Sequence, residues 1–126
     1  MGRQIMKYLL DSNIIIYHLN GLSEATDFIA ENISRCAISQ ITFVEVLSFD
    51  YNEEEASQVR EFLDHFTILD TNKAIAIQCL KNRKIKKIKI PDNFIASTAQ
   101  VNDLILVTRN IEDFKQLDVQ LQNILN

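Results

Sequence analysis

The stretch Leu104-Ile105-Leu106-Val107-Thr108 contains the clearest strand pattern in the chain. A short, continuous apolar run of this kind is typical of a strand that is covered on both faces. Three similar runs precede it, at residues 7–10, 36–38 and 67–69, and residues 119–125 add a candidate edge strand. Because buried strands of this type occur in parallel sheets with helices on both sides, the pattern predicts an α/β fold.

Helical patterns occupy the segments between these strands. Apolar side chains recur there at spacings of three and four residues, the period of one helix face. Ser23 and Ser39 are candidate N-caps, and Asn20-Gly21 is a helix-stop pair. The expected helices span residues 12–19, 23–33, 40–49, 53–66, 71 to about 87, 92–101 and 110–117. The expected inward face of the longest helix consists of Ala74, Ile75, Ile77 and Leu80.

This alternation of strands and helices predicts a three-layer α/β/α fold with a short, mostly parallel central sheet of four to five strands. A length of 126 residues fits one compact domain, and the sequence contains no internal repeat or linker. We therefore expect a single domain over residues 1–126. The first strand begins near Lys7, so residues 1–5 are either native or an added extension, with Met6 as the alternative start.

Composition excludes several classes of protein. The chain is 47% hydrophobic and has two Gly and one Pro, which excludes a disordered chain and a collagen-like repeat. No apolar stretch approaches the roughly 20 residues that a membrane helix needs. Lys7, Asp11 and Asn13 interrupt the apolar region that a secretory signal would require.

The cysteines indicate a reducing compartment. Cys36 and Cys79 form no C-x-x-C pair, and both lie beside apolar residues, as buried free thiols usually do. We therefore expect no disulfide, no zinc site and a cytoplasmic location. His18 and His65 are expected to be ordinary helix residues.

Basic residues are concentrated in one segment of an otherwise acidic chain. The net charge is −4, yet residues 81–89 carry six positive charges and no acid. The six are Lys81, Arg83, Lys84, Lys86, Lys87 and Lys89. This segment is either a local anion-binding patch or a solvated helix end, since cations also favour the C-termini of helices.

Three acids occupy apolar surroundings. Asp11 ends the first strand, Glu45 lies within the apolar segment 41–47, and Asp92 shares a helix face with Ile95 and Ala96. No Lys or Arg occurs between residues 35 and 60, so Glu45 has no cation nearby in the sequence. A buried charge requires a partner. The bland alternatives are a strand-end turn for Asp11, a half-exposed position for Glu45 and an N-cap for Asp92.

A shared divalent cation would explain all three acids together. Clustered carboxylates repel one another, and a hard cation removes that repulsion. Ligation by oxygen alone suits Mg²⁺ or Mn²⁺ better than zinc. Such an ion activates water and stabilises charge on a phosphate, so the hydrolysis of phosphodiester bonds is the reaction class that we expect.

Four segments of the chain resemble the motifs of a known family. They are LLDSNII at 9–15, TFVEVL at 42–47, IPDNFIASTA at 90–99 and LVTRNIEDF at 106–114. In this order they resemble the PIN domain, and most closely the VapC-type toxins of bacterial and archaeal toxin–antitoxin pairs. The resemblance extends from Lys7 to about Leu121. It implies a PIN-like fold and a Mg²⁺- or Mn²⁺-dependent endoribonuclease.

The resemblance also implies roles for individual residues. Asp11, Glu45 and Asp92 match the metal-binding acids of the family. Asn110 stands where the family commonly has a fourth acid, and Asp113 is a candidate for the missing charge. Thr108 matches a residue that holds the Asp11 carboxylate by a hydrogen bond, and the residues expected to surround the acids are Ser12, Asn13, Thr108 and Asn110. Candidate RNA contacts are Arg109, Lys84, Lys86 and Lys87.

The partners implied by the resemblance are an RNA substrate, a second copy of the chain and a cognate antitoxin. The antitoxin is expected to lie along the helices near Phe28, Ile29, Phe43 and Leu47, with a basic side chain directed at the acids. Operator DNA would be contacted only through the antitoxin.

Two other functions remain as alternatives. A non-catalytic PIN-like module that binds RNA or protein fits the absence of the fourth acid. A haloacid-dehalogenase-like phosphatase also places an Asp after its first strand, but it requires a second acid at the position of Asn13. A phosphate-binding loop is excluded because Gly2 and Gly21 are the only glycines.

Overall fold

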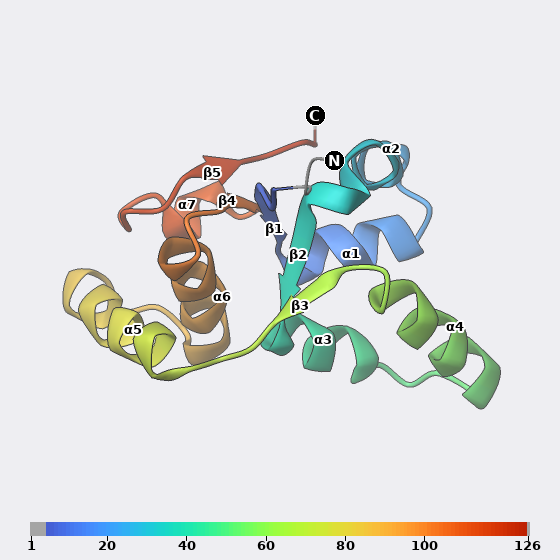
Figure 1. Ribbon diagram of the computed structural model, residues 1–126, viewed down its shortest axis with the longest axis horizontal. Coiled ribbons are helices and arrows are strands. Elements are labelled where there is room, and N and C mark those ends of the chain that lie inside the picture. The colour runs from blue at the N-terminus through green and yellow to red at the C-terminus, as the bar shows by residue number, and fades with distance from the viewer. Residues whose placement is uncertain (1–4, 126) are drawn as a thin grey trace.

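Five parallel strands form the central sheet of the computed structural model, which describes residues 5–125 (Figure 1). The strands are β1 (Tyr8–Leu10), β2 (Cys36–Ser39), β3 (Thr67–Leu69), β4 (Ile105–Val107) and β5 (Leu121–Gln122). Their order across the sheet is β3-β2-β1-β4-β5, so β1 lies in the centre. Leu9 pairs with Ala37 of β2 and with Leu106 of β4. The carboxyl ends of all five strands lie along one edge, where sheets of this type bind ligands.

Helices connect the strands throughout residues 5–125. They are α1 (Ser12–Leu19), α2 (Ser23–Asn32), α3 (Gln40–Leu47), α4 (Glu53–Leu63), α5 (Lys73–Ile85), α6 (Ile90–Val101) and α7 (Ile111–Phe114), with a short 3-10 helix over Ile33–Arg35. The expected helices and strands are all present. Most of the helices end earlier than expected, and α6 begins at Ile90 instead of Asp92.

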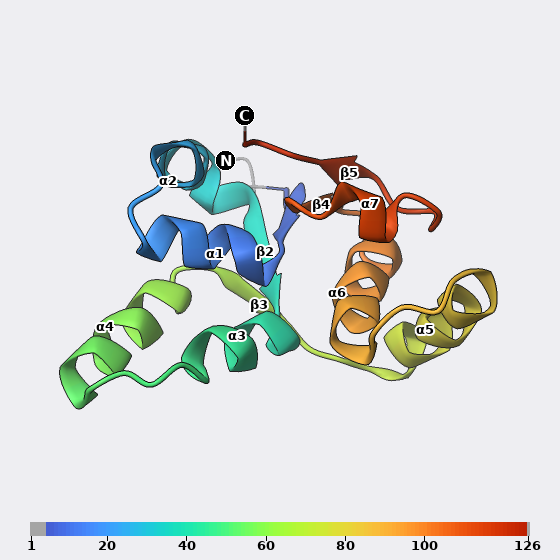
Figure 2. The ribbon, with the colours of Figure 1, turned by 180° about the vertical axis from the view of Figure 1, so that it is seen from behind.

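The helices form two layers, one on each face of the sheet (Figures 1 and 2). Strand side chains alternate between the faces, so Leu10 and Ile38 pack with α1 to α4, while Leu9 and Leu106 pack with α6 and α7. Helix α5 lies outside α6 (Figure 1). The predicted three-layer α/β/α fold is therefore confirmed.

Local capping explains most of the helix boundaries. The Ser39 hydroxyl accepts a hydrogen bond from the main-chain N–H of Thr42 at 3.0 Å, which confirms the predicted N-cap of α3. Gly21 has a φ of 85°, the left-handed conformation expected after a helix stop. The N-cap prediction for Ser23 is wrong: Leu22 holds that position, and the Ser23 hydroxyl bonds to the adjacent Glu24.

The predicted inward face of α5 is wrong in three of its four residues. Ile75 is buried, but Ala74, Ile77 and Leu80 are exposed, and Leu80 is 66% exposed. The other buried residues of α5 are Cys79 and Asn82. The reason is the neighbouring helix: α6 presents polar side chains to α5, so the more apolar stripe of α5 turns outward.

The polar side chains between α5 and α6 form a network of hydrogen bonds. The buried Asn82 side-chain amide lies at 3.0 Å from Asn93 Oδ1, 3.0 Å from Ser97 Oγ and 2.8 Å from Gln100 Oε1. Cys79 Sγ lies 3.2 Å from Ser97 Oγ. No buried side-chain nitrogen or oxygen lacks a partner in the described part of the chain. The network thus satisfies the polar groups that join α5 to α6.

The cysteines and the histidines were expected to be structural residues. Cys36 and Cys79 are buried free thiols, as predicted. His18 lies in α1, as predicted, where it stacks on Phe62 and bonds to Thr26. His65 lies outside a helix, because α4 ends at Leu63, and its exposed ring contacts the carbonyl of Glu61. None of the helices within residues 5–125 has both the length and the apolar character needed to cross a membrane. The question of an added extension concerns residues 1–5, and residues 1–4 lie outside the described part.

Candidate active site

The three acids singled out in the sequence lie at the carboxyl edge of the sheet. Asp11 follows β1 directly, Glu45 lies on α3, which follows β2, and Asp92 lies in the first turn of α6. Helices α3 and α6 stand on either side of the end of β2 (Figures 1 and 2). The sheet topology thus brings together three positions that are far apart in the chain.

Asp11 is almost fully buried, with 4% of its surface exposed. Its Oδ1 accepts from the main-chain N–H of Ser12 at 2.8 Å. Its Oδ2 accepts from the Thr108 hydroxyl at 2.7 Å and from the Asn13 amide at 3.4 Å. The Thr108 bond is the one that the family resemblance implied, and together these bonds fix the orientation of the carboxylate.

The surroundings of Asp11 disfavour its charged form. Burial raises the pKa of Asp11 to about 6, and the negative charges of Asp92 and Glu45 also raise it. The hydrogen bonds from Thr108 and Ser12 act in the opposite direction. Neither of the ion pairs within residues 5–125 involves the Asp11 carboxyl group.

Glu45 is tied to the end of β1 through Ser12. The Ser12 hydroxyl lies 2.5 Å from Glu45 Oε1 and 3.0 Å from Thr42 Oγ1. Thr42 and Glu45 are three residues apart on α3, which places both on the same helix face. Sequence reasoning did not identify Thr42, although its position one turn before Glu45 was the available signal.

Asp92 is half-buried in the first turn of α6, and Lys89 holds the N-cap position that the alternative interpretation gave to Asp92. Burial raises the pKa of Asp92, and the charges of Glu45 and Asp113 raise it further, whereas Lys89 lowers it. Glu45 therefore acts electrostatically on both other acids. The three carboxylates form one electrostatic cluster.

This cluster is not yet a formed metal cage. Within residues 5–125 no three His, Cys, Asp or Glu side chains are arranged closely enough to hold an ion. Nor does any of the three acids form an ion pair in that part of the chain, where the ion pairs are Arg60–Asp64 and Lys115–Glu112. Uncompensated carboxylates with oxygen-only donors suit a hard divalent cation, so the residues present fit Mg²⁺ or Mn²⁺.

The position of the absent fourth acid is occupied by Asn110. Its main-chain N–H donates to the Thr108 hydroxyl at 3.0 Å, so the segment supports the donor to Asp11. Asp113 lies one turn further along α7 and lines a pocket of about 260 Å³ that it shares with Asp92. Asp113 thus supplies negative charge beside Asp92, which Asn110 does not.

The predicted RNA contacts differ in their surroundings. Exposed Arg109 stacks over the Tyr17 ring at 5.5 Å and donates to the Tyr17 hydroxyl, while its main-chain N–H donates to Asn13. Lys84 is exposed on α5. The Lys86 ammonium donates to the carbonyls of Glu112 and Asp113 at 3.2 and 2.8 Å. Sequence reasoning missed Tyr17, which stands four residues after Asn13 on α1.

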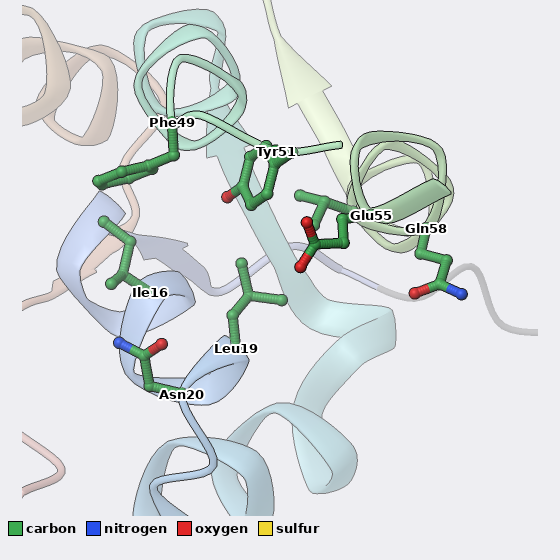
Figure 3. Close-up of a pocket in the computed structure, with 8 residues that line it drawn as sticks. Ile16, Leu19, Asn20, Phe49, Tyr51, Glu55 and Gln58 are labelled. Atoms are coloured by element: carbon green, nitrogen blue, oxygen red, sulfur yellow. The ribbon is translucent and has the colours of Figure 1, made fainter. Parts of the chain in front are cut away.

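An apolar groove opens on the other side of the cluster, between α1 and the α3–α4 segment (Figure 3). One pocket of about 460 Å³ is lined by Ile16, Leu19, Asn20, Phe49, Tyr51, Glu55, Gln58 and Val59. A second, of about 420 Å³, shares Ile16 and Phe49 and reaches Ser12 and Glu45. We call this pair of pockets the α1–α3 groove; its second pocket reaches Glu45 of the cluster.

The expected antitoxin contacts do not coincide with this groove. Ile29 is buried in the core, and Phe28 packs edge-on against Tyr8, so neither offers a docking face. Phe43 lies under the Arg60 guanidinium, and Leu47 is half-buried. Phe28 and Ile29 are therefore engaged within the protein, because α2 turns its apolar stripe onto the sheet, and the docking position of the antitoxin stays a prediction.

Comparison with known proteins places these features in a family. The profile described as "PIN domain" matches residues 8–120. "Ribonuclease VapC2" of Haemophilus influenzae is 29% identical over 123 residues, which cover 90% of this chain and 93% of that protein.

Solved structures agree with this match. A "Toxin-antitoxin complex from Klebsiella pneumoniae" has a TM-score of 0.84 at 30% identity, covering 94% of this chain and 98% of that chain. VapBC2 from Rickettsia felis, "bound to a DNA fragment from their promoter", has a TM-score of 0.79 at 25% identity, with coverage of 94% and 98%. With the profile spanning nearly the whole chain, this protein belongs to the PIN domain family.

Proposed function

We propose that this chain is a metal-dependent endoribonuclease and the toxin of a VapBC-type pair. The observation that carries the proposal is the cluster of Asp11, Glu45 and Asp92 at the carboxyl edge of the sheet, in which no acid forms an ion pair within residues 5–125. The similarity to Ribonuclease VapC2 supports the reaction class. The whole chain is proposed to act as one domain.

In this proposal Asp11, Glu45 and Asp92 hold Mg²⁺ or Mn²⁺, directly or through water. When bound, such an ion would supply an activated water and would stabilise charge at the phosphorus. Attack of that water with cleavage of the P–O3′ bond would leave a 5′-phosphate and, once the leaving oxygen takes up a proton, a 3′-hydroxyl. The Thr108 hydroxyl orients Asp11, and the Ser12 hydroxyl orients Glu45. These donors prepare the carboxylates and reduce the reorganisation that ion binding requires.

Further residues have supporting roles in the proposal. The Asn13 amide donates to Asp11 Oδ2, which also accepts from Thr108, and the main-chain N–H of Asn110 donates to Thr108. Asp113 contributes charge beside Asp92 and is the candidate fourth acid. Arg109, held against Tyr17, is positioned to contact an RNA phosphate close to the acids.

The proposed partners follow the relatives found as toxin–antitoxin complexes. The antitoxin is proposed to fill the α1–α3 groove, where Leu19, Val44 and Phe49 are exposed, and to direct a basic side chain at Glu45. Operator DNA is then contacted through the antitoxin. A homodimer and a cytoplasmic location remain part of the proposal, the latter because both thiols are free and the substrate is RNA.

Cleavage of RNA tests the proposed activity. With Mg²⁺ the wild-type chain should cut total RNA at defined sites, and EDTA should abolish the cutting. Asp11→Asn should reduce the rate at least about a hundredfold, since it removes one charged ligand from the proposed ion site. Equal cleavage by both proteins, or cleavage that persists in EDTA, would mean a contaminating nuclease and would refute the proposal.

Calorimetric titration with Mn²⁺ distinguishes the ribonuclease from the non-catalytic binding module. A ribonuclease should bind Mn²⁺ in a manner that is weakened by Glu45→Gln and by Asp92→Asn. A binding module should show no Mn²⁺ uptake that depends on these two residues. Mapping the cleavage sites on total RNA would then identify the substrate sequence.

A further inference from the structure

The segment that joins α5 to α6 is held rigidly beside the acid cluster. The main-chain N–H of Lys86 donates to Asn82 at 2.9 Å, and the Arg83 guanidinium donates to the carbonyl of Ile88 at 3.1 Å. The main-chain N–H of Asn93 donates to the carbonyl of Lys89 at 2.9 Å. Ile88 is buried in the core below α6. The lysines of this segment therefore project from a fixed backbone.

The four residues of the segment divide between two sides. Lys86 and Lys89 have extended backbone conformations, in which alternate side chains point to opposite sides. Ile88 points inward, and its neighbours Lys87 and Lys89 are exposed. Lys86 is half-buried, and its ammonium is occupied by the carbonyls of Glu112 and Asp113. Lys86 therefore fastens the segment to α7.

The ammonium groups of Lys87 and Lys89 are less engaged than that of Lys86, although the charge of Lys89 lowers the pKa of Asp92. In the part of the chain that the structure describes, neither side chain makes a hydrogen bond, and the ion pairs are Arg60–Asp64 and Lys115–Glu112. Both residues line the pocket of about 260 Å³ that also contains Asp92 and Asp113. Two cations that make no hydrogen bond within the described residues thus line the same pocket as Asp92, a proposed ion ligand.

A polyanion that approaches the carboxylates needs such cations. Asp11, Glu45, Asp92 and Asp113 repel each phosphate of an RNA strand, and one divalent ion offsets only part of that charge. Lysine is a compact point charge that binds phosphate without a demanding geometry. Pairing with a phosphate would also give a partner to the Lys87 and Lys89 ammonium groups, which make no hydrogen bond within residues 5–125.

We propose that Lys87 and Lys89 bind a backbone phosphate of the RNA next to the scissile one, whereas Lys86 serves to hold their segment in place. This inference rests on the proposed ribonuclease function and assigns the substrate contact to two residues of the basic segment. It narrows the sequence expectation, which grouped Lys84, Lys86 and Lys87 as RNA contacts.

The salt dependence of RNA binding tests the assignment. All proteins carry Asp11→Asn so that the probe, a fluorescein-labelled single-stranded RNA of mixed sequence, remains uncut. Relative to this parent, Lys87→Ala combined with Lys89→Ala should weaken binding about tenfold at low salt. The slope of log affinity against log salt should fall by about 0.7, because each phosphate neutralised on a single strand contributes about 0.7 and the two lysines share one phosphate.

Two matched variants sharpen the result. Lys73→Ala combined with Lys81→Ala removes the same charge from the exposed face of α5 and should leave the slope unchanged. Lys86→Ala should lower the unfolding midpoint while keeping the slope. An unchanged slope in the Lys87 and Lys89 double variant would overturn the inference. An equal fall in the Lys73 and Lys81 variant would also overturn it, because charge would then act without regard to position.

The outcome remains separable from the proposed function. Cleavage of the same RNA is measured in chains with Asp11 intact. If the chain cuts RNA but the slope is unaffected by Lys87 and Lys89, only the lysine assignment fails. If the slope falls as expected but no cutting occurs in Mg²⁺, the phosphate site stands and the ribonuclease function fails.

Discussion

The acid cluster lies between two unlike surfaces. On one side the α1–α3 groove is largely apolar, with Ile16 and Phe49 at its centre. On the other side the segment 86–89 presents lysines around a small polar pocket. Burial of apolar area is non-directional and strong, whereas phosphate contacts depend on salt. The comparison indicates that a protein partner and an RNA strand would use different surfaces while competing for the same carboxylates.

The largest expected effect concerns the apolar surface. Phe49 is 54% exposed and lines both pockets of the groove. Phe49→Asp should weaken binding of the cognate antitoxin about a hundredfold, because an exposed aromatic ring that becomes buried in an interface is a typical hot spot. The measurement is titration of the purified antitoxin against the variant.

Val101→Asp provides the control for this prediction. Val101 is also exposed and apolar, but it lies at the end of α6, outside the residues that line the groove. Its replacement should leave antitoxin binding unchanged. If Phe49→Asp binds the antitoxin as tightly as the wild type does, the groove is not the docking surface and the contrast between the two sides is lost.

The next effect concerns the shared cluster. The folded-state pKa of Asp11, about 6, lies above the ordinary value of 3.8, because burial disfavours the charge. The folded protein therefore holds this proton more tightly than the unfolded chain does. The free energy of unfolding of the metal-free protein should fall as the pH rises from 4 to 7, by on the order of 2 kcal/mol from this group.

Asp11→Asn isolates that contribution. The variant should be more stable than the wild type at pH 7.5 without metal, and the difference should shrink toward pH 4. Urea unfolding at each pH provides the measurement. Saturating Mn²⁺ should reverse the order at pH 7.5, because the ion stabilises only the intact carboxylate cluster. A difference between the two proteins that does not change with pH would contradict the burial of an unpaired charge.

Two substitutions distinguish the two faces of α5, the helix that precedes the basic segment 86–89. Asn82→Ala leaves Asn93, Ser97 and Gln100 without their shared donor and should cost about 2 kcal/mol in urea unfolding. Ile77→Ser, on the exposed face, should change stability by less than about 0.5 kcal/mol. If the two costs were equal, the polar network would not be what joins α5 to α6.

Much of the fold could be predicted because apolar periodicity acts locally. Residues 104–108 and 7–10 are too short and too apolar for anything but buried strands, and the Ser39 cap was readable from its position. The prediction of the buried face of α5 failed because the neighbouring helix α6 determines which side chains are buried. Leu80 looked like a core residue, but α6 offered amide and hydroxyl groups, so α5 turned Asn82 inward.

The acids, considered one by one, were each open to an ordinary explanation. Their setting after strands and on apolar faces nevertheless identified Asp11, Glu45 and Asp92 together, and the structure places them in one electrostatic cluster. Sequence reasoning did not identify Thr42 or Tyr17. Contacts between elements decide those features, and no local spacing encodes them.

By itself, the sequence determined the elements, their parallel sheet and the residue types available for chemistry, because hydrophobic period and capping depend on neighbours along the chain. Only the tertiary structure decided which charges remain unpaired. The Lys86 ammonium donates to carbonyls of α7, while the ammonium groups of Lys87 and Lys89, which line a pocket with Asp92, make no hydrogen bond within the described residues. Charge interactions depend on distance in space, and the distances between segments far apart in the chain are set by how the two helical layers pack on the sheet.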